Sequence, residues 1–257
     1  MTDNRFDLTG KTALITGASS GLGEHFATIL SHAGARVVVA ARRAERLQTL
    51  VETIQTGGGQ ALAVTMDVTD SDSIDAGFDQ AEAAFGTVDI LVNNAGIGDP
   101  VAFLDMTEGN WRSMMDTNLD GAWRVAHRAT VAMAKAGQGG CVINIASILG
   151  LRVGTALSHY AVAKAGVVQL TKAMALELAR HNIRVNAIAP GYFRTEMNGD
   201  YFDTEKGQQY IRSKVPMRRL GVLEELSGPL LLLASEAGSF MTGSVLNVDG
   251  GHLSNSL

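Results

Sequence analysis

Seven short runs of apolar residues, rich in Val, Ile and Ala, recur along the chain and barely alternate with polar residues. A run of this kind predicts a strand that is buried on both faces. The predicted strands cover Thr12–Thr16, Arg36–Ala40, Ala61–Met66, Asp89–Asn93, Val142–Ala146, Arg184–Ile188 and Ser244–Val248.

Longer segments with the apolar spacing of a helix separate these runs. The predicted helices cover Glu24–His32, Glu45–Thr56, Ser71–Phe85, Trp111–Ala136, Tyr160–Arg180 and Leu223–Leu233. Strands that alternate with helices form a parallel sheet covered on both sides. The pattern therefore predicts an α/β protein with a doubly wound, seven-stranded parallel sheet.

Neither an internal repeat nor a low-complexity linker divides the chain, so we expect a single domain over residues 1–257. The longest stretch without a clear strand or helix pattern runs from Pro190 to about Gly221. Segments of that length are often lids or binding loops in compact domains. We therefore expect a substrate-binding loop or lid over residues 192–220.

The composition is that of a compact globular protein, with 46% hydrophobic residues, 18% charged residues and 29 glycines. A net charge of −5 offers no basic face for nucleic acid. No apolar run reaches the roughly 18 residues of a membrane span, and the first ten residues do not match a secretory signal. The lone Cys141 lies in an apolar run and is expected to be a buried, inert thiol. We expect a cytoplasmic protein that binds neither nucleic acid nor membrane.

A glycine-rich turn follows the first predicted strand, and a helix follows the turn directly. The turn reads Gly17-Ala18-Ser19-Ser20-Gly21-Leu22-Gly23. Glycines permit a tight turn and let a pyrophosphate approach the backbone N–H groups at the positive end of a helix. The spacing differs from the common Gly-x-Gly-x-x-Gly fingerprint, but the required context of strand, turn and helix is present. An ordinary glycine-rich turn is the alternative interpretation.

The second predicted strand is followed by Arg42 and Arg43, with no carboxylate at its end. An acidic residue at this place would bind the ribose hydroxyls of NAD. Guanidinium groups instead bind a 2′-phosphate through paired, charge-assisted hydrogen bonds. The two arginines therefore favour NADP, used as NADPH in the reducing direction. NAD stays possible, because the pair could also form a solvated helix entry with Glu45 and Arg46.

Further landmarks follow in order along the chain. Asn93-Asn94-Ala95-Gly96 stands at a strand end, Asn118 in a helix and Ser147 at another strand end, while Tyr160 precedes Lys164 by four residues. Together with the glycine turn, this set closely resembles the short-chain dehydrogenase/reductase family over nearly the whole chain. The resemblance is to its 3-oxoacyl reductases, carbonyl reductases and alcohol dehydrogenases. It implies a Rossmann-type fold and hydride transfer between a nicotinamide cofactor and a carbonyl or secondary alcohol carbon.

Tyr160 is expected to be the proton donor and acceptor of this reaction. A phenol with a pKa of about 10 is a poor base at pH 7 unless a nearby cation tunes it. Lys164 lies one helical turn away on the same face, where its ammonium favours the phenolate, and Ser147 can hydrogen-bond the substrate oxygen. The resemblance adds that Lys164 binds the nicotinamide ribose and that Asn118 holds a water that relays protons from Lys164. A solvent-facing Tyr–Lys pair and a helix-capping Ser are the alternatives.

The resemblance also assigns the cofactor contacts. Asp67 and Val68 are expected to hold the adenine, and Thr195 to lie near the nicotinamide carboxamide. The family often has an aliphatic residue in place of Phe193, so only its backbone contact is expected. The expected cofactor residues are Gly17, Ser19, Ser20, Gly21, Leu22, Gly23, Arg42, Arg43, Asp67, Val68, Asn94, Ala95, Gly96, Tyr160, Lys164, Pro190, Gly191, Phe193 and Thr195.

The expected substrate wall is mostly apolar or aromatic, which suits a hydrophobic ketone or secondary alcohol, and a 3-oxoacyl thioester is one candidate. Its residues are Ile97, Ser147, Ile148, Leu149, Gly154, His159, Tyr160, Tyr192, Met197, Tyr201 and Phe202. Because a helix turns by about 100° per residue, a supporting or surface position is equally open for His159. No spacing of His, Cys and acidic residues matches a metal site, and none is expected.

The resemblance further implies a homotetramer, in which the helices that carry Asn118 and Tyr160 pack against a neighbour. Three other functions stay open: an NAD(H)-linked secondary alcohol dehydrogenase, a non-catalytic dinucleotide-binding sensor, and an enzyme of elimination or epimerisation on the same scaffold. The joint presence of Ser147, Tyr160, Lys164 and Asn118 argues against the sensor. Elimination or epimerisation would need a further acid or base that the sequence does not identify.

Overall fold

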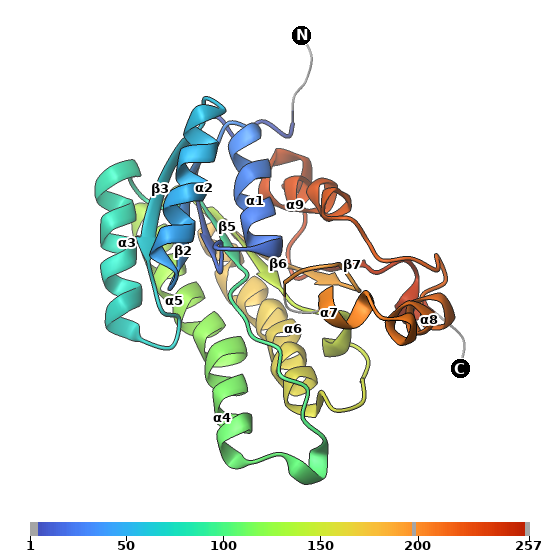
Figure 1. Cartoon of the computed structure of the whole chain (residues 1–257). Helices are drawn as coiled ribbons and strands as arrows, with labels where there is room; N and C mark the ends of the chain where they lie inside the picture. Colours follow the sequence, from blue (N-terminus) through green and yellow to red (C-terminus); the bar gives the residue numbers. More distant parts are fainter. Residues whose placement is uncertain (1–4, 197–198, 255–257) are drawn as a thin grey trace.

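One seven-stranded sheet organises the chain, and the computed structural model describes its residues 5–196 and 199–254 (Figure 1). The strands are β1 (Thr12–Thr16), β2 (Arg36–Ala41), β3 (Gln60–Thr65), β4 (Ile90–Asn93), β5 (Gly140–Ile145), β6 (Ile183–Pro190) and β7 (Val245–Val248). They are parallel and follow the order β3-β2-β1-β4-β5-β6-β7. The predicted doubly wound, seven-stranded parallel sheet is confirmed. Its order reverses between β1 and β4, where sheets of this kind bind ligands at the carboxyl ends of their strands.

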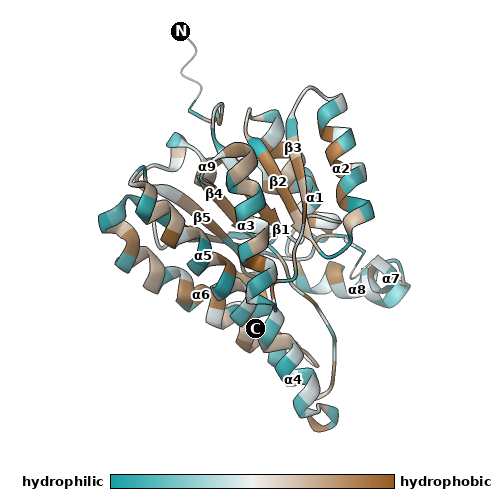
Figure 2. Cartoon of the chain, turned by 90° about the vertical axis from the view of Figure 1, so that its left-hand side faces the viewer, coloured by the Kyte–Doolittle hydropathy of each residue, from teal (hydrophilic) through white to brown (hydrophobic). Residues whose placement is uncertain are grey.

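Helices cover both faces of the sheet. They are α1 (Gly21–His32), α2 (Ala44–Thr56), α3 (Ser71–Phe85), α4 (Glu108–Met115), α5 (Gly121–Ala136), α6 (Ser158–Leu178), α7 (Gly199–Phe202), α8 (Glu205–Lys214) and α9 (Ser227–Ala234). Buried side chains of α1, α2 and α9 pack with one set of strand residues, and those of α3, α5 and α6 with the other. Figure 2 shows the apolar strands enclosed between these layers. This double burial explains why the strand sequences do not alternate.

Two stretches differ from the sequence predictions. The segment between Pro190 and Gly221, which shows no clear pattern, carries the short helices α7 and α8, and α8 begins where the Thr204 hydroxyl accepts a hydrogen bond from Gly207 N. The single helix predicted over Trp111–Ala136 is α4 and α5 joined by a π-helical turn at Asp116–Asp120. Such turns are frequent at functional sites, and this one carries Asn118.

Within residues 5–196 and 199–254, no helix combines the length and the apolar character that crossing a membrane requires.

Candidate active site

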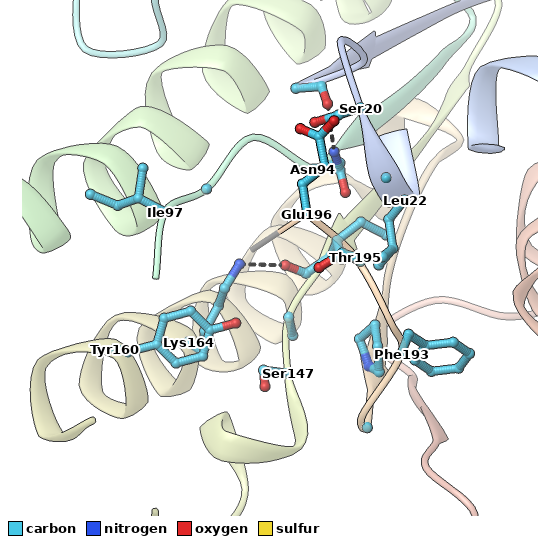
Figure 3. Close-up of a pocket in the computed structure, with 17 residues that line it drawn as sticks. Ser20, Leu22, Asn94, Ile97, Ser147, Tyr160, Lys164, Phe193, Thr195 and Glu196 are labelled. Carbon is cyan, nitrogen blue, oxygen red and sulfur yellow. Dashed lines mark hydrogen bonds between the residues drawn. The ribbon is translucent and has the colours of Figure 1, made fainter. Parts of the chain in front are cut away.

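Two cavities lie at the reversal point of the sheet and share Gly17, Ser20, Gly96 and Ile97, so they form one groove. The first is drawn in Figure 3. It is lined by Gly17, Ser20, Gly21, Leu22, Asn94, Gly96, Ile97, Ile145, Ala146, Ser147, Tyr160, Lys164, Pro190, Gly191, Phe193, Thr195 and Glu196. The second is lined by Thr16, Gly17, Ser19, Ser20, Ala40, Ala41, Arg42, Arg43, Met66, Asp67, Val68, Ala95, Gly96, Ile97 and Thr117. Every expected cofactor residue except Gly23 thus lines this groove.

The glycine turn shapes the middle of the groove. Gly17 and Gly21 have φ angles of +66° and +58°, which residues with a side chain rarely adopt. Gly23 does not line the groove but packs beneath it, because a Cβ there would lie 2.3 Å from the Gly17 carbonyl oxygen. The side chain of Ser20, the N-cap of α1, makes no capping hydrogen bond. The first N–H groups of α1 are therefore left for an anion in the groove, which fits a pyrophosphate.

Cationic side chains line the second cavity of the groove. Arg43 donates to the hydroxyls of Ser19 and Ser20, at 3.0 and 2.7 Å. Arg42 lies 3.9 Å from the carboxylate of Asp67. Hydrogen bonds from Thr69, its backbone N–H foremost, hold the pKa of Asp67 below its usual value, so that Asp67 is ionised. This mixture of guanidinium groups, hydroxyls and one carboxylate fits a phosphorylated adenosine.

Ser147, Tyr160 and Lys164 meet at the other end of the groove. Ser147 follows β5 and lines the same cavity as Tyr160 and Lys164. The Ser147 oxygen accepts a bond of 3.1 Å from Leu149 N, which fixes the side chain. Lys164, one turn after Tyr160 on α6, donates to the Ile145 carbonyl at 2.8 Å. Figure 3 shows the side chains of Tyr160 and Lys164 reaching from α6 into the pocket that Ser147 also lines.

Burial dominates the electrostatics of Tyr160 and Lys164. Burial raises the pKa of Tyr160, and the nearby Ser147 hydroxyl opposes this rise. The Lys164 nitrogen lies 5.8 Å from the centre of the Tyr160 ring and is directed to Ile145. Burial in turn lowers the pKa of Lys164 to about 8. The expectation that the Lys164 ammonium favours the Tyr160 phenolate stays a prediction.

Asn118 is buried on the π-helical turn, and its side chain is committed to the backbone of Ile97. Its Oδ1 accepts from Ile97 N at 2.8 Å, and its Nδ2 donates to Ile97 O at 2.9 Å. A Cβ on Gly96 would lie 3.2 Å from this Oδ1 and 3.7 Å from the Lys164 nitrogen, so Gly96 keeps a space open between the two side chains. With both ends of the amide used, the side chain fixes the position of Asn118 against the backbone of Ile97. Its expected role in holding a relay water stays a prediction.

An apolar wall stands beside Tyr160. Ile148, Leu149 and Ala161 are buried there, and Leu157, Tyr160, Tyr192 and Leu253 pack against them. The Tyr192 ring meets three other rings edge-on, those of Phe202, Tyr210 and His252. Its hydroxyl is 3.1 Å from that of Tyr210, and burial raises its pKa. Leu149 and Tyr192 thus belong to the same apolar cluster as Tyr160.

His159 does not belong to this wall. Its ring is fully buried, it lines neither cavity of the groove, and neither ring nitrogen has a hydrogen-bond partner in the described chain. The turn of about 100° per residue directs it away from the side on which Tyr160 points. Tyr201 is half exposed and lines neither cavity, while Met197 lies outside the described residues.

Sequence reasoning missed Glu196, which lines the groove beside Thr195. Its carboxylate is bonded to Arg46 at 2.6 and 2.8 Å. Its place directly after Thr195 was a signal that it belongs to this region. Nothing in the sequence links it to a helix 150 residues earlier.

Comparison with known proteins covers nearly the whole chain. The family model described as Enoyl-(Acyl carrier protein) reductase matches residues 17–252. The 3-oxoacyl-(acyl-carrier-protein) reductase FabG of Thermotoga maritima is 36% identical over 244 residues, which span 95% of this chain and 98% of that protein. A short-chain type dehydrogenase/reductase from Mycobacterium marinum matches with a TM-score of 0.93 and 45% identity over 97% of this chain and 98% of its own. A gluconate 5-dehydrogenase from Burkholderia cenocepacia, in complex with NADP and tartrate, matches with a TM-score of 0.95 and 37% identity over 98% and 99%.

Proposed function

The chain belongs to the short-chain dehydrogenase/reductase family, and from this premise we propose that it transfers a hydride between NADP(H) and a carbonyl or secondary alcohol, with Tyr160 as general acid and base. The observation that carries the proposal is that Ser147, Tyr160 and Lys164 line one cavity at one end of the groove. At that point two hydroxyls can meet one substrate oxygen. A NADP complex of a relative, the gluconate 5-dehydrogenase, supports the choice of cofactor.

The bound nicotinamide supplies or accepts the hydride. Tyr160 donates its phenolic proton to the substrate oxygen during reduction and takes it back during oxidation. Ser147 bonds the same oxygen and stabilises the charge that develops on it. The Lys164 ammonium has three donors and gives one to Ile145 O, so two remain for the nicotinamide ribose. The N–H groups of the first turn of α1 would hold the pyrophosphate, and Arg42 and Arg43 would hold the 2′-phosphate.

Replacement of the proposed acid tests this mechanism. Tyr160→Phe should lower kcat by at least about 100-fold, the usual range for a general acid, and should leave the Kd for NADPH within about twofold. Nicotinamide absorbance and fluorescence measure the two quantities. Tyr201→Phe is the matched control, because that half-exposed ring lies outside the groove and should keep full activity. A kcat of Tyr160→Phe close to the wild-type value would refute the assignment. Cofactor binding by the wild type without turnover of any carbonyl or alcohol would favour a sensor.

The wall of Ile148, Leu149, Leu157, Tyr192 and Leu253 supports a hydrophobic ketone or alcohol as the substrate. Apolar area of this kind stabilises a hydrocarbon substituent but offers few partners to the hydroxyls of a sugar acid. We expect kcat/KM for a medium-chain alkyl ketone or a 3-oxoacyl thioester to exceed that for a keto-gluconate at least about tenfold, which is about 1.4 kcal/mol of transition-state binding. A higher kcat/KM for the keto-gluconate would refute the hydrophobic substrate class but would leave the proposed hydride transfer intact.

Homotetramer formation is part of the proposal. Four large apolar side chains are exposed on two helices, Trp123 and Val131 on α5 and Val162 and Leu176 on α6. Packing of these faces against a second copy would remove them from water. Light scattering coupled to size-exclusion chromatography measures the mass in solution, and a monomer at micromolar concentration would contradict this assembly.

A further inference from the structure

Glu196 joins two parts of the cofactor groove that are far apart in the sequence. It follows β6, yet its carboxylate lies 2.6 and 2.8 Å from the Arg46 guanidinium and 3.5 Å from that of Arg43. Arg43 is the N-cap residue of α2, and Arg46 lies in the first turn of that helix. Bonds to Arg46, with a smaller effect of Arg43, hold the pKa of Glu196 below its usual value, so the carboxylate is charged at neutral pH.

The position of this carboxylate coincides with the path of an anionic cofactor. Glu196 lines the cavity that also contains Ser20, Gly21 and Leu22, the residues around the N-terminus of α1. Figure 3 shows its side chain beside Ser20, at the glycine-turn end of that cavity. Arg43, whose guanidinium also bonds the Ser20 hydroxyl, lines the adjoining cavity. Glu196 therefore places a negative charge between the two ends of the groove.

The Arg43 guanidinium binds two anions at once less favourably than it binds one. Its Nη1 faces Glu196, while its Nε and Nη2 donate to Ser19 and Ser20. A 2′-phosphate at this guanidinium would bring two negative charges close to the Glu196 carboxylate, and like charges at short range repel. A ribose with a free 2′-hydroxyl brings no such charge and leaves the pair of Arg43 and Glu196 in place.

We propose that Glu196 is a specificity-determining residue, because its carboxylate competes with the 2′-phosphate of NADP for the Arg43 guanidinium. NADP has to displace the carboxylate from Arg43 when it binds, whereas NAD does not. The proposal rests on the proposed function, because it uses the assignment of Arg43 to the 2′-phosphate. Glu196 then weakens a preference for NADP that the arginines alone would make stronger. The more strongly the Glu196 carboxylate competes for Arg43, the closer the affinities for NADP and NAD become.

Replacement of the carboxylate by its neutral isostere tests the inference. Both cofactors carry the pyrophosphate, so the ratio of the Kd for NADH to the Kd for NADPH isolates the 2′-phosphate. Glu196→Gln should raise this ratio about two- to fivefold, the equilibrium effect of an exposed ion pair. Titration of the nicotinamide fluorescence of the full-length protein gives both constants. Glu52→Gln removes the same charge from α2 outside the groove and should leave the ratio unchanged.

Two further variants separate this inference from the function on which it rests. In an Arg43→Gln background, Glu196→Gln should no longer change the ratio, because the shared cation is gone. If Glu196→Gln weakens NADPH binding, or tightens NADPH and NADH equally, the competition at Arg43 is overturned while the cofactor assignment stands. If Arg43→Gln alone leaves the Kd for NADPH unchanged, the 2′-phosphate site itself is wrong, and the inference falls with it.

Discussion

Replacement of Lys164 by Met should abolish activity without a loss of stability. Lys164 is 5% exposed, and its ammonium has one hydrogen bond from Nζ, at 2.8 Å to Ile145 O. Met has a similar length and no charge, so it can fill the same space among buried residues. Without the ammonium, the nicotinamide ribose loses the donors that we propose for it. We expect kcat/KM to fall by at least about 100-fold.

The expected stability follows from the pKa of Lys164. Burial lowers it from 10.5 to about 8, so keeping the ammonium charged in the folded protein at pH 7 costs about 3 kcal/mol. Removal of the side chain's donors leaves Ile145 O without this partner, which costs about 1–3 kcal/mol. The Met variant should therefore be between equally stable and about 2 kcal/mol more stable than the wild type. For a chain of this size that is a rise in Tm of at most about 8 °C.

The pH dependence gives the sign of the effect. Between about pH 8 and 10.5 the unfolded chain keeps the Lys164 proton and the folded protein loses it. The free energy of unfolding of the wild type therefore rises with pH relative to that of the Lys164→Met variant, and the difference between the two proteins shrinks. Thermal unfolding of both proteins at pH 7 and pH 10 measures this convergence. Lys172→Met, an exposed position on the same helix, should show neither the convergence nor the loss of activity. A Lys164→Met protein that is clearly less stable at pH 7, or that retains turnover, would refute the reasoning.

Three further predictions concern the groove and its support. Gly23→Ala should weaken NADPH binding at least about tenfold in a fluorescence titration, because its Cβ would lie 2.3 Å from Gly17 O, and unchanged affinity would contradict this packing role. Asp70→Ala removes the side chain that caps α3 and should lower Tm by about 2–4 °C, the effect of about 1 kcal/mol; an unchanged Tm would show that the cap contributes nothing. Cys141, whose burial raises its pKa to about 11, should not react with a thiol reagent in the native protein at pH 8 but should react fully in denaturant, and labelling of the native protein would contradict its burial.

The strands and long helices were predictable because their burial pattern is regular. β1 and β2 are covered on both faces, and their apolar runs could be identified to within one residue. α8 could not, because among its ten residues only Gly207 and Ile211 are buried and its polar surface hides the helical period. The π-helical turn at Asp116–Asp120 has no sequence pattern of its own, so the chain there resembles one long helix.

The groove was predictable where chain order brings its residues together. Parallel strands end at the same edge of the sheet, so the turn after β1, Ser147 after β5 and the segment after β6 had to converge. Contacts across the groove had no such signal. The pair of Glu196 and Arg46 depends on side-chain directions in two elements 150 residues apart, and the commitment of Asn118 to Ile97 depends on the π-helical turn.

The buried polar residues on α6 differ in how fully they are hydrogen-bonded, and the difference indicates which of them are present for stability. Thr171 satisfies its hydroxyl within the fold, through Asn144 and the carbonyl of Val167. Lys164 has one bond from its ammonium and carries a desolvation cost, and His159 has no partner for either ring nitrogen in the described chain. Apolar side chains would fill those two places at lower free energy. Because burial of such a group is costly without full pairing, the presence of Lys164 beside Tyr160 is better explained by the chemistry of the groove than by packing. His159 lines neither cavity of the groove, so this explanation does not extend to it.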